Sequence, residues 1–181
     1  LEMDGWKIDA VVVGSQKGLM LPPGLGLVAV GPRAWGRSKT ARSPRFTWNW
    51  SSYIGQVPVT PPLSLMHQLD AALDLIDDMG PAGVYKRRAE VAERIRGLVA
   101  RSGLEIFAKR PGNGITGVIA PRSFDIHRFL ERLRDEHSIL IAGAPGKLNG
   151  EIFRIGHVGH LTDEELDYFS ESFEKALTAE S

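Results

Sequence analysis

A short segment near the start of the chain places a lysine beside polar residues in a tight turn. The residues Gly14-Ser15-Gln16-Lys17 follow the apolar run Ala10–Val13, and Pro22-Pro23-Gly24 precedes a second apolar run, Leu25–Val30. Short apolar runs bounded by turn residues are typical of buried strands, so Lys17 is predicted on a turn between two of them. An amine held there can attack a carbonyl and form a Schiff base. From this local spacing alone, an ordinary exposed turn lysine is the simpler interpretation.

Charge is distributed unevenly along the chain. The 181 residues carry 22 Lys plus Arg and 22 Asp plus Glu, but Ala10–Leu69 contains no acidic residue. This segment carries +6 and the remainder −6, and its bases are Lys17, Arg33, Arg37, Lys39, Arg42 and Arg45. Such asymmetry favours an anionic partner for the basic part, although a solvated basic loop has the same composition. The absence of Cys from the sequence excludes thiol catalysis and Cys-ligated zinc.

Three further patterns indicate less. Gly112–Gly117 has the letters G-x-G-x-x-G, but a strand-like run follows it where a dinucleotide site needs a helix, so a turn is predicted. His157 and His160 lie three apart on a predicted loop without a nearby acidic ligand, and no metal site is expected. The basic, aromatic stretch Arg33–Trp50 has residue types that bind single-stranded nucleic acid, but it has no recognisable module. Nucleic-acid binding is therefore the least favoured alternative.

The hydrophobic pattern predicts the elements that must position these residues. Gly31–Pro62 shows no clear periodic element and is expected to be irregular. A helix begins after Pro62, is interrupted at Gly80-Pro81, and is followed by a second helix from about Gly83 to Arg101. The remaining predictions are strands at Leu104–Ala108, Ile115–Ala120, Ile139–Ala142 and Ile152–Gly156, a helix capped by Ser123, and a last helix opened by the capping box Thr162–Glu165.

Three segments, in order, resemble motifs of one enzyme family. Ile8–Lys17 followed by Pro22-Pro23-Gly24 is similar to the pyridoxal-phosphate lysine segment of the class V aminotransferases. Thr60-Pro61-Pro62 resembles the T-P motif of that family. Ile152–Gly159 resembles its C-terminal R-I-G-H-M-G motif, with Val158 where Met is common. Within the family, the chain resembles the alanine–glyoxylate and serine–pyruvate aminotransferases and their soluble hydrogenase subunit relatives.

The resemblance implies roles for four residues. Lys17 would be the Schiff-base lysine, and Gln16 beside it would contact the cofactor phosphate. Thr60 would reach the phosphate bound by the partner subunit of a homodimer. Arg154 would bind the substrate α-carboxylate, a task that suits its planar guanidinium, whereas its alternative is an ordinary strand arginine in a surface salt bridge. Val57-Pro58-Val59 stands where relatives often carry a tyrosine, so the resemblance implies no phosphate contact from a hydroxyl there.

The resemblance also implies that part of the pocket lies outside these residues. The aromatic side chain that stacks on the cofactor ring and the aspartate that pairs with its pyridinium nitrogen lie, in the family, upstream of the lysine segment. We therefore expect the chain to be a C-terminal portion of the enzyme. The isolated chain is expected to bind cofactor weakly and to be inactive, because a pyridinium without its carboxylate is a poorer electron sink.

The implied fold is α/β, the type I fold of the pyridoxal-phosphate enzymes. Residues 1–75 would be the C-terminal part of the large cofactor-binding domain, and residues 76–181 a complete α+β small domain. The implied reaction is a ping-pong transfer of an amino group from a small amino acid (alanine or serine) to a 2-oxo acid (glyoxylate or pyruvate). A cytoplasmic homodimer is expected, with no membrane, metal or nucleic-acid partner. A non-catalytic assembly subunit that pairs with a separate N-terminal half is the main alternative.

Overall fold

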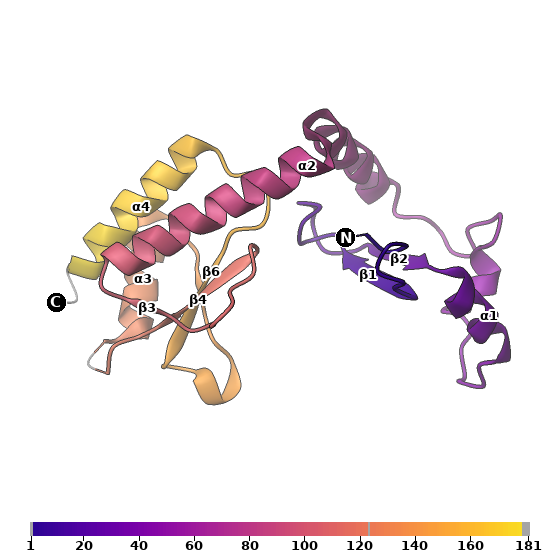
Figure 1. The fold of residues 1–181 in the computed structure, drawn as a ribbon, viewed down its shortest axis with the longest axis horizontal. Coiled ribbons are helices and arrows are strands. Elements are labelled where there is room, and N and C mark those ends of the chain that lie inside the picture. Colours follow the sequence, from indigo (N-terminus) through magenta and orange to yellow (C-terminus); the bar gives the residue numbers. More distant parts are fainter. Residues whose placement is uncertain (1, 123, 179–181) are drawn as a thin grey trace. The chain divides into compact units, whose positions relative to one another are not determined.

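The chain divides into two units, which meet in the sequence at Asp78 and Met79 (Figure 1). The structure, a computed structural model, describes residues 2–122 and 124–178. The division lies close to the boundary expected after residue 75. The assignment of the two units to a large and a small domain stays a prediction.

The first unit is built on a two-stranded antiparallel sheet. β1 (Ala10–Gly14) pairs with β2 (Gly26–Val30) along its whole length. Both strands lie where the sequence predicts them, but the prediction that they are buried is wrong: the Val12 side chain is 74% exposed and that of Val28 is 43% exposed. Runs of β-branched residues favour extended backbone even where no second layer covers them, and no other described element packs extensively on this sheet.

A helix, α1 (Pro32–Thr40), and a 3-10 turn, η1 (Trp50–Tyr53), lie in the stretch that was expected to be irregular. A proline at the helix start presets the backbone for a helical turn, and the Arg45 guanidinium donates to two carbonyls at the C-terminal end, at 2.6 and 3.0 Å. The ring of Trp35 meets that of Trp50 edge-on, with centroids 5.9 Å apart. No residue of α1 is buried, so hydrophobic periodicity could not reveal it.

Helix α2 (Leu63–Arg101) contains the interruption predicted at Gly80-Pro81. Gly80 has φ +67° and ψ 154°, a conformation that ends one helical segment before the next begins. Pro81 has no backbone N–H and cannot continue the hydrogen-bond ladder across this point. The break coincides closely with the division between the two units.

The second unit contains a four-stranded antiparallel sheet in the order β3–β4–β6–β5. The strands are β3 (Glu105–Ile106), β4 (Ile115–Ile119), β5 (Ala142–Gly143) and β6 (Ile152–Gly156), and a 3-10 turn, η2 (Gly146–Leu148), precedes β6. β4 and β6 match their predicted ranges, and β4 directly follows the glycine turn. β3 is shorter than predicted, and the strand predicted at Ile139–Ala142 is wrong except for its last residue. β3 and β5 are the edge strands of this sheet, so each has a hydrogen-bonded neighbour on one side only, and edge strands are often short.

Two helices, α3 (Ile126–His137) and α4 (Asp163–Thr178), complete this unit. Ser123, the predicted cap of α3, lies outside the described residues, and Asp125 caps the helix by accepting a hydrogen bond from the backbone N–H of Arg128. The capping box of α4 is confirmed. The Thr162 N–H donates to the Glu165 carboxylate at 2.8 Å, and the Glu165 N–H donates to the Thr162 hydroxyl at 3.1 Å.

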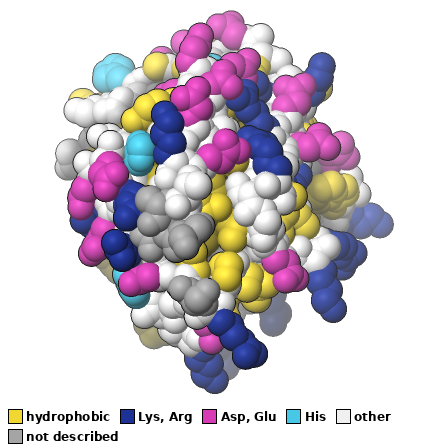
Figure 2. Space-filling view, turned by 90° about the vertical axis from the view of Figure 1, so that its left-hand side faces the viewer, with side chains coloured by type: hydrophobic (Ala, Val, Ile, Leu, Met, Phe, Trp, Pro, Cys, Tyr) yellow, Lys and Arg dark blue, Asp and Glu magenta, His cyan; other side chains and the backbone are white. Residues whose placement is uncertain are grey.

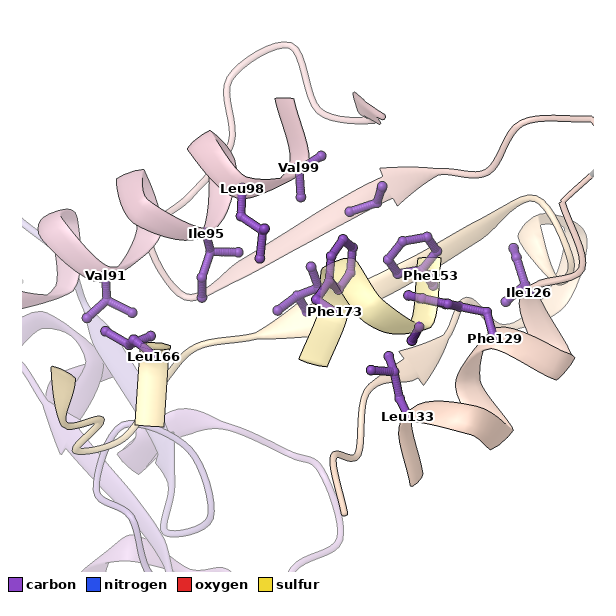
Figure 3. Packing of buried hydrophobic residues seen from close by; sticks show 13 residues of the cluster. Val91, Ile95, Leu98, Val99, Ile126, Phe129, Leu133, Phe153, Leu166 and Phe173 are labelled. Carbon is purple, nitrogen blue, oxygen red and sulfur yellow. The ribbon is translucent and has the colours of Figure 1, made fainter. Parts of the chain in front are cut away.

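Three phenylalanine side chains form the centre of the second unit (Figure 3). The rings of Phe129 (α3), Phe153 (β6) and Phe173 (α4) are fully buried and contact one another with centroids 5.4 to 6.2 Å apart. The C-terminal part of α2 packs on the same face of the sheet and adds aliphatic side chains, namely Val91, Ile95, Leu98 and Val99. The second unit therefore has a continuous apolar core that joins one sheet face to three helices.

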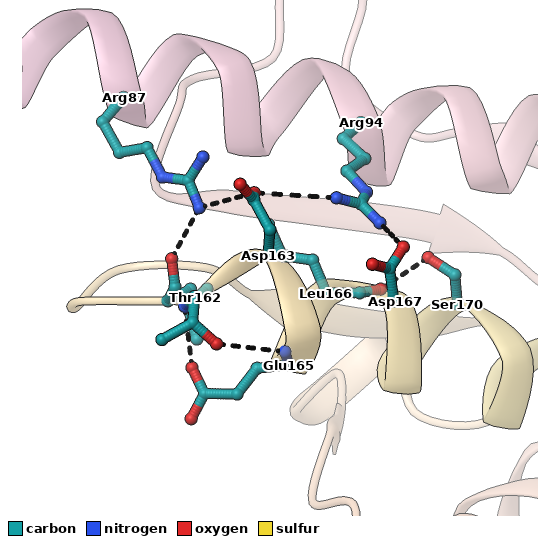
Figure 4. A network of polar contacts seen from close by, with 9 residues as sticks. Arg87, Arg94, Thr162, Asp163, Glu165, Leu166, Asp167 and Ser170 are labelled. Carbon is teal, nitrogen blue, oxygen red and sulfur yellow. Dashed lines mark hydrogen bonds and ion pairs between the residues drawn. The ribbon is translucent and has the colours of Figure 1, made fainter.

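Ion pairs hold the start of α4 against α2 (Figure 4). Arg87 donates to the Asp163 carboxylate at 2.9 Å and to the carbonyl of Leu161 at 2.7 Å. Arg94 contacts the same aspartate at 3.7 Å and also pairs with Asp167. Single surface ion pairs contribute little, but acidic residues in the first turn also interact favourably with the helix dipole. The network fixes the orientation of α4 on the core.

The surface of the second unit is mixed in charge. On the face that Figure 2 shows, acidic and basic side chains are interspersed around smaller apolar areas. None of the described helices combines the length and apolar character needed to cross a membrane. Within residues 2–122 and 124–178, no group of three or more His, Cys, Asp or Glu side chains could hold a metal ion.

His157, predicted on a loop, is fully buried directly after β6. Its Nε2 is hydrogen-bonded to the Thr116 hydroxyl of β4 at 2.9 Å. Burial of the ring, followed by the nearby guanidinium groups of Arg96 and Arg88, lowers the pKa of His157 from its usual 6.5. Arg88 also donates to the backbone carbonyls of His157 and Gly159. This histidine is therefore a structural residue that secures the end of β6.

Truncation of Phe129 tests the phenylalanine cluster. We expect Phe129→Ala to lower the free energy of unfolding of the second unit by about 3–5 kcal/mol, because it removes a fully buried ring from a close-packed core. Leu140→Ala is the control, since that side chain is 83% exposed, and its effect should stay within about 0.5 kcal/mol. Urea unfolding followed by circular dichroism measures both. Equal effects of the two substitutions would contradict the packing argument.

The lowered pKa of His157 predicts a pH dependence of stability. As the pH falls below about 6.5, His157 takes up a proton in the unfolded chain before it does so in the folded chain, so the free energy of unfolding decreases. The decrease ends once the pH is below the pKa of His157 in the folded chain. His157→Gln should flatten this part of the stability profile. His127→Gln, at an exposed histidine of α3, should leave the profile unchanged. A profile that keeps its slope in His157→Gln would show that another group titrates.

Candidate functional site

Lys17 lies in the loop that joins β1 to β2. Its backbone carbonyl accepts a hydrogen bond from the N–H of Met20 at 3.0 Å, which closes a tight turn. The side chain is exposed, and no described residue forms an ion pair or hydrogen bond with its amine. Lys17 lies on a turn as predicted, but the two strands that flank it are not buried by other described residues. The loop thus presents an accessible, unpaired primary amine.

Gln16, beside Lys17, is also exposed. Its side chain folds back over the end of β1, since a Cβ added at Gly14 would lie 2.9 Å from the Gln16 Oε1 atom. The residue before it, Ser15, is fully buried. Ser15 lies within the lysine motif, but a serine beside a turn carries no sequence signal that it is buried.

Thr60 is exposed in the extended segment that leads into α2. The first turn of this helix touches the end of the lysine loop at Gly24, where an added Cβ would lie only 2.5 Å from the Leu65 side chain. Gly24 also has φ +152°, which L side chains rarely adopt. Gly24 therefore suits this position chiefly through its backbone conformation, and the Leu65 side chain of α2 lies directly against it.

The basic residues of the first unit have two kinds of surroundings. Arg33 makes a two-pronged ion pair with Asp9, at 2.5 and 2.6 Å, and this hydrogen bonding lowers the pKa of the Asp9 carboxyl. Arg45 binds the end of α1 through carbonyls. Both arginines line a cavity of about 1000 Å³ that also contains Arg37 and Trp48. Two of the six basic residues of the acid-free segment, Arg33 and Arg45, are therefore paired with groups of the first unit itself.

Arg154 occupies the central position of β6 in the second unit. Its direct neighbours across the sheet are Gly117 on β4 and Ala142 on β5, so no large side chain stands beside it on either strand. Its Nε and Nη2 atoms both donate to the carbonyl of Gly143, at 3.1 and 2.9 Å. The Arg154 side chain is half-buried, and the Gly143 carbonyl holds one edge of its guanidinium. No described residue forms a hydrogen bond with its Nη1 atom. A carboxylate is the group that such a fork binds best.

The structure brings some of the predicted site residues into one unit. Lys17, Gln16 and Thr60 lie in the first unit, and Arg154 lies in the second. The first three residues present an amine, an amide and a hydroxyl on exposed segments free of acidic residues. This set of groups can receive an aldehyde and a phosphate, whereas Arg154 can receive a carboxylate.

Comparison with known proteins places this arrangement in a family. No protein-family model matches the chain. It is 35% identical over 176 residues to serine–glyoxylate aminotransferase of Methylorubrum extorquens, and 34% identical over 169 residues to L-aspartate–glyoxylate aminotransferase of Paracoccus denitrificans. It is also 33% identical over 171 residues to the soluble hydrogenase small subunit of a Synechococcus strain. These alignments cover 89–91% of this chain and 43–44% of the relatives.

Solved structures give the same result. The crystal structure of alanine–glyoxylate aminotransferase from Nostoc superposes on 97% of this chain with a TM-score of 0.88 and 26% identity. That of pyridoxamine–pyruvate aminotransferase from Mesorhizobium loti superposes on 98% with a TM-score of 0.87 and 28% identity. The chain covers 49% and 48% of these two proteins, so it spans about half the length of the relatives it matches. The chain belongs to the class V aminotransferases, corresponds to their C-terminal half, and has the type I fold of pyridoxal-phosphate enzymes.

Proposed function

We propose that the protein is part of a pyridoxal-phosphate-dependent aminotransferase in which Lys17 is the catalytic residue. The observation that carries this proposal is the Lys17 loop, where an exposed amine without a described partner lies in a segment that resembles the family's lysine motif. Alignment over about 90% of the chain with relatives named as glyoxylate aminotransferases supports it.

The residues of the first unit fit the proposed cofactor. Pyridoxal phosphate has an aldehyde that an amine can hold and a dianionic phosphate that hydrogen-bond donors can hold. Lys17 and Gln16 would supply an amine and an amide to one cofactor, and Thr60 would supply a hydroxyl to the phosphate bound by the partner subunit. The surrounding segment, Ala10–Leu69, carries no acidic residue that would repel the phosphate. When bound, the cofactor supplies an electron sink for the bond that breaks at the substrate Cα.

Lys17 would have two tasks in the reaction. Its Nζ would first hold the cofactor at the aldehyde carbon. As a free amine, the Nζ atom would then act as the base that takes the proton from the substrate Cα and gives it back later in the reaction. Both tasks need an accessible amine on a backbone that does not move far, and the tight turn that includes Lys17 supplies that backbone.

Arg154 would orient the substrate. The Gly143 carbonyl fixes one edge of its guanidinium, which leaves Nη1 and the second hydrogen of Nη2 for the two oxygens of an α-carboxylate. Its cross-strand neighbours Gly117 and Ala142 are small, and Phe107 and Ile152 lie next to Gly117, where an added Cβ would be 3.5 and 3.8 Å from them. We propose a small amino donor, alanine or serine, and glyoxylate or pyruvate as the acceptor: three of the relatives are named for serine or alanine with glyoxylate and one for pyruvate, whereas another is named for L-aspartate. Thr60 would reach the cofactor phosphate of the partner subunit in a homodimer.

A second candidate function follows from the exposed faces of β1 and β2. Val12 and Val28 are exposed apolar side chains in this chain, and two relatives are named as soluble hydrogenase subunits. A non-catalytic subunit that pairs with a separate N-terminal half would cover these faces. Co-purification of such a half chain, without Lys17 chemistry, would favour this candidate over the aminotransferase.

Reductive trapping tests the proposed role of Lys17. In the assembled enzyme, after incubation with pyridoxal phosphate and reduction with borohydride, peptide mass spectrometry should find the reduced cofactor on Lys17, because this exposed amine lies in the segment that resembles the family's lysine motif. Lys17→Arg should abolish the label. Lys39→Arg, at another exposed lysine of the same unit, should not change it. Label on other lysines, or no label, would contradict the proposal.

Substitution of Arg154 tests the carboxylate site. In the assembled enzyme, Arg154→Lys should raise the KM for the amino donor by about ten- to a hundredfold, since it removes one or two charge-assisted hydrogen bonds. The kcat should fall less, because Lys17 is untouched. Arg134→Lys is the matched control, as Arg134 is an exposed arginine of α3 that pairs with Asp135. An unchanged KM in Arg154→Lys would mean that another group binds the carboxylate.

A further inference from the structure

Ser15 differs from its surroundings in the first unit. It is fully buried, whereas the two residues that follow it, Gln16 and Lys17, are exposed. Among the described residues of this unit, only two apolar side chains are also buried, those of Leu21 and Ala72. A hydroxyl buried in a unit with so few buried side chains needs hydrogen-bond partners, and the partners it has identify its role.

Four hydrogen bonds join Ser15 to the far side of the lysine loop. Its hydroxyl donates to the Pro22 carbonyl at 2.8 Å and accepts from the Leu25 N–H at 3.1 Å. Its backbone N–H donates to the Leu25 carbonyl at 3.0 Å, and its own carbonyl accepts from the Leu21 N–H at 3.1 Å. One residue therefore ties down both ends of the loop formed by residues 16–24.

The remaining contacts in the loop are weaker constraints on Lys17. Its side chain has no partner among the described residues, and its backbone contributes one turn hydrogen bond, to Met20. Met20 is held at φ +61°, a conformation that costs energy for a residue other than glycine. A strained backbone conformation persists only where the neighbouring structure holds it in place. The hydrogen bonds of Ser15 to Leu21, Pro22 and Leu25 hold the chain before and after this turn.

We propose that Ser15 is a positioning residue for the Lys17 amine. The inference rests on the proposed function, in which Lys17 holds the cofactor and moves a proton. Ser15 touches neither cofactor nor substrate; it acts by fixing the backbone from which Lys17 projects. A reacting group displaced by about 1 Å can lose on the order of a hundredfold in rate, so a fixed loop has a large effect on the chemistry.

The requirement is specific to a small hydroxyl side chain. The Pro22 carbonyl needs a donor and the Leu25 N–H needs an acceptor, and one hydroxyl satisfies both. Alanine at this position leaves both backbone groups without a partner. Threonine retains the hydroxyl and is also compatible with extended backbone, so it is the conservative replacement.

Two measurements on the full chain test the proposal. Hydrogen exchange without cofactor reports the loop directly: Ser15→Ala should speed exchange of the Leu21 and Leu25 amides at least tenfold, while the amides of β1 stay protected if the sheet is intact. Borohydride trapping with subsaturating pyridoxal phosphate should show about tenfold less label on Lys17 in the same variant.

Two further variants complete the design. Ser15→Thr should restore both the protection and the label. Ser51→Ala should change neither, because its hydroxyl is exposed and has no hydrogen-bond partner among the described residues.

The outcomes separate the two hypotheses. Faster exchange together with less label on Lys17, both reversed by threonine, supports the positioning role. Label that is unchanged in Ser15→Ala overturns the positioning role alone, whether or not exchange is faster. Absence of label on Lys17 in the unsubstituted, assembled enzyme at saturating pyridoxal phosphate overturns the proposed function, and with it the role of Ser15.

Discussion

The hydrogen bonds of Ser15 are the constraint on which the first unit depends most. An antiparallel pair of strands is marginal in water when no second layer covers it, and among the described residues no other element packs extensively on β1 and β2. The unit therefore relies on local backbone hydrogen bonds, and those at Ser15 close the sheet at the end where Lys17 begins the turn. The same bonds that hold the hairpin together also fix the residue on which the proposed chemistry rests.

The second unit depends on a different interaction, the packing of apolar side chains. Three buried phenylalanines join α3, α4 and β6, and the capping box and ion pairs then fix the start of α4. This difference has a functional consequence. Arg154 projects from the central region of a sheet whose other face is a dense core, so its backbone has little freedom. The backbone of Arg154, the proposed substrate-binding residue, is thus held by a packed apolar core. The backbone of Lys17, the proposed catalytic residue, is held by the hydrogen bonds of Ser15.

The sequence predicts those parts of the fold whose cause is local. The break at Gly80-Pro81, strand β6 and the capping box of α4 are each specified by a few adjacent residues. Helix α1 could not be predicted in this way, because Arg45 and Trp50 stabilise it from outside its own range. The burial of β1 and β2 was predicted wrongly because an apolar run looks the same in sequence whether or not a second layer covers it.

The residues of the candidate site likewise fall into those that a local sequence pattern predicts and those that it does not. The motifs give Lys17 and Arg154 directly, because reactive residue types mark them. The surroundings of Arg154 could not be predicted, since Gly117 and Ala142 come beside it only through strand pairing. Ser15 was overlooked because a serine in a turn is ordinarily exposed, and only the bonds to Pro22 and Leu25 reveal that it is buried.

The uneven charge of the chain can now be explained in part by these contacts. Arg33 is neutralised by Asp9, which lies just outside the acid-free segment, and Arg45 binds carbonyls at the end of α1. These two bases hold the fold of the first unit and need no external anion. Lys17 is different, because it lies on an exposed turn with no acidic residue among its neighbours in the sequence. An amine in that setting keeps its capacity to react, since an adjacent carboxylate would pair with it and compete with a phosphate or a carbonyl. The absence of acidic residues near Lys17 in the sequence therefore suits the proposed role of this amine as the group that holds the cofactor.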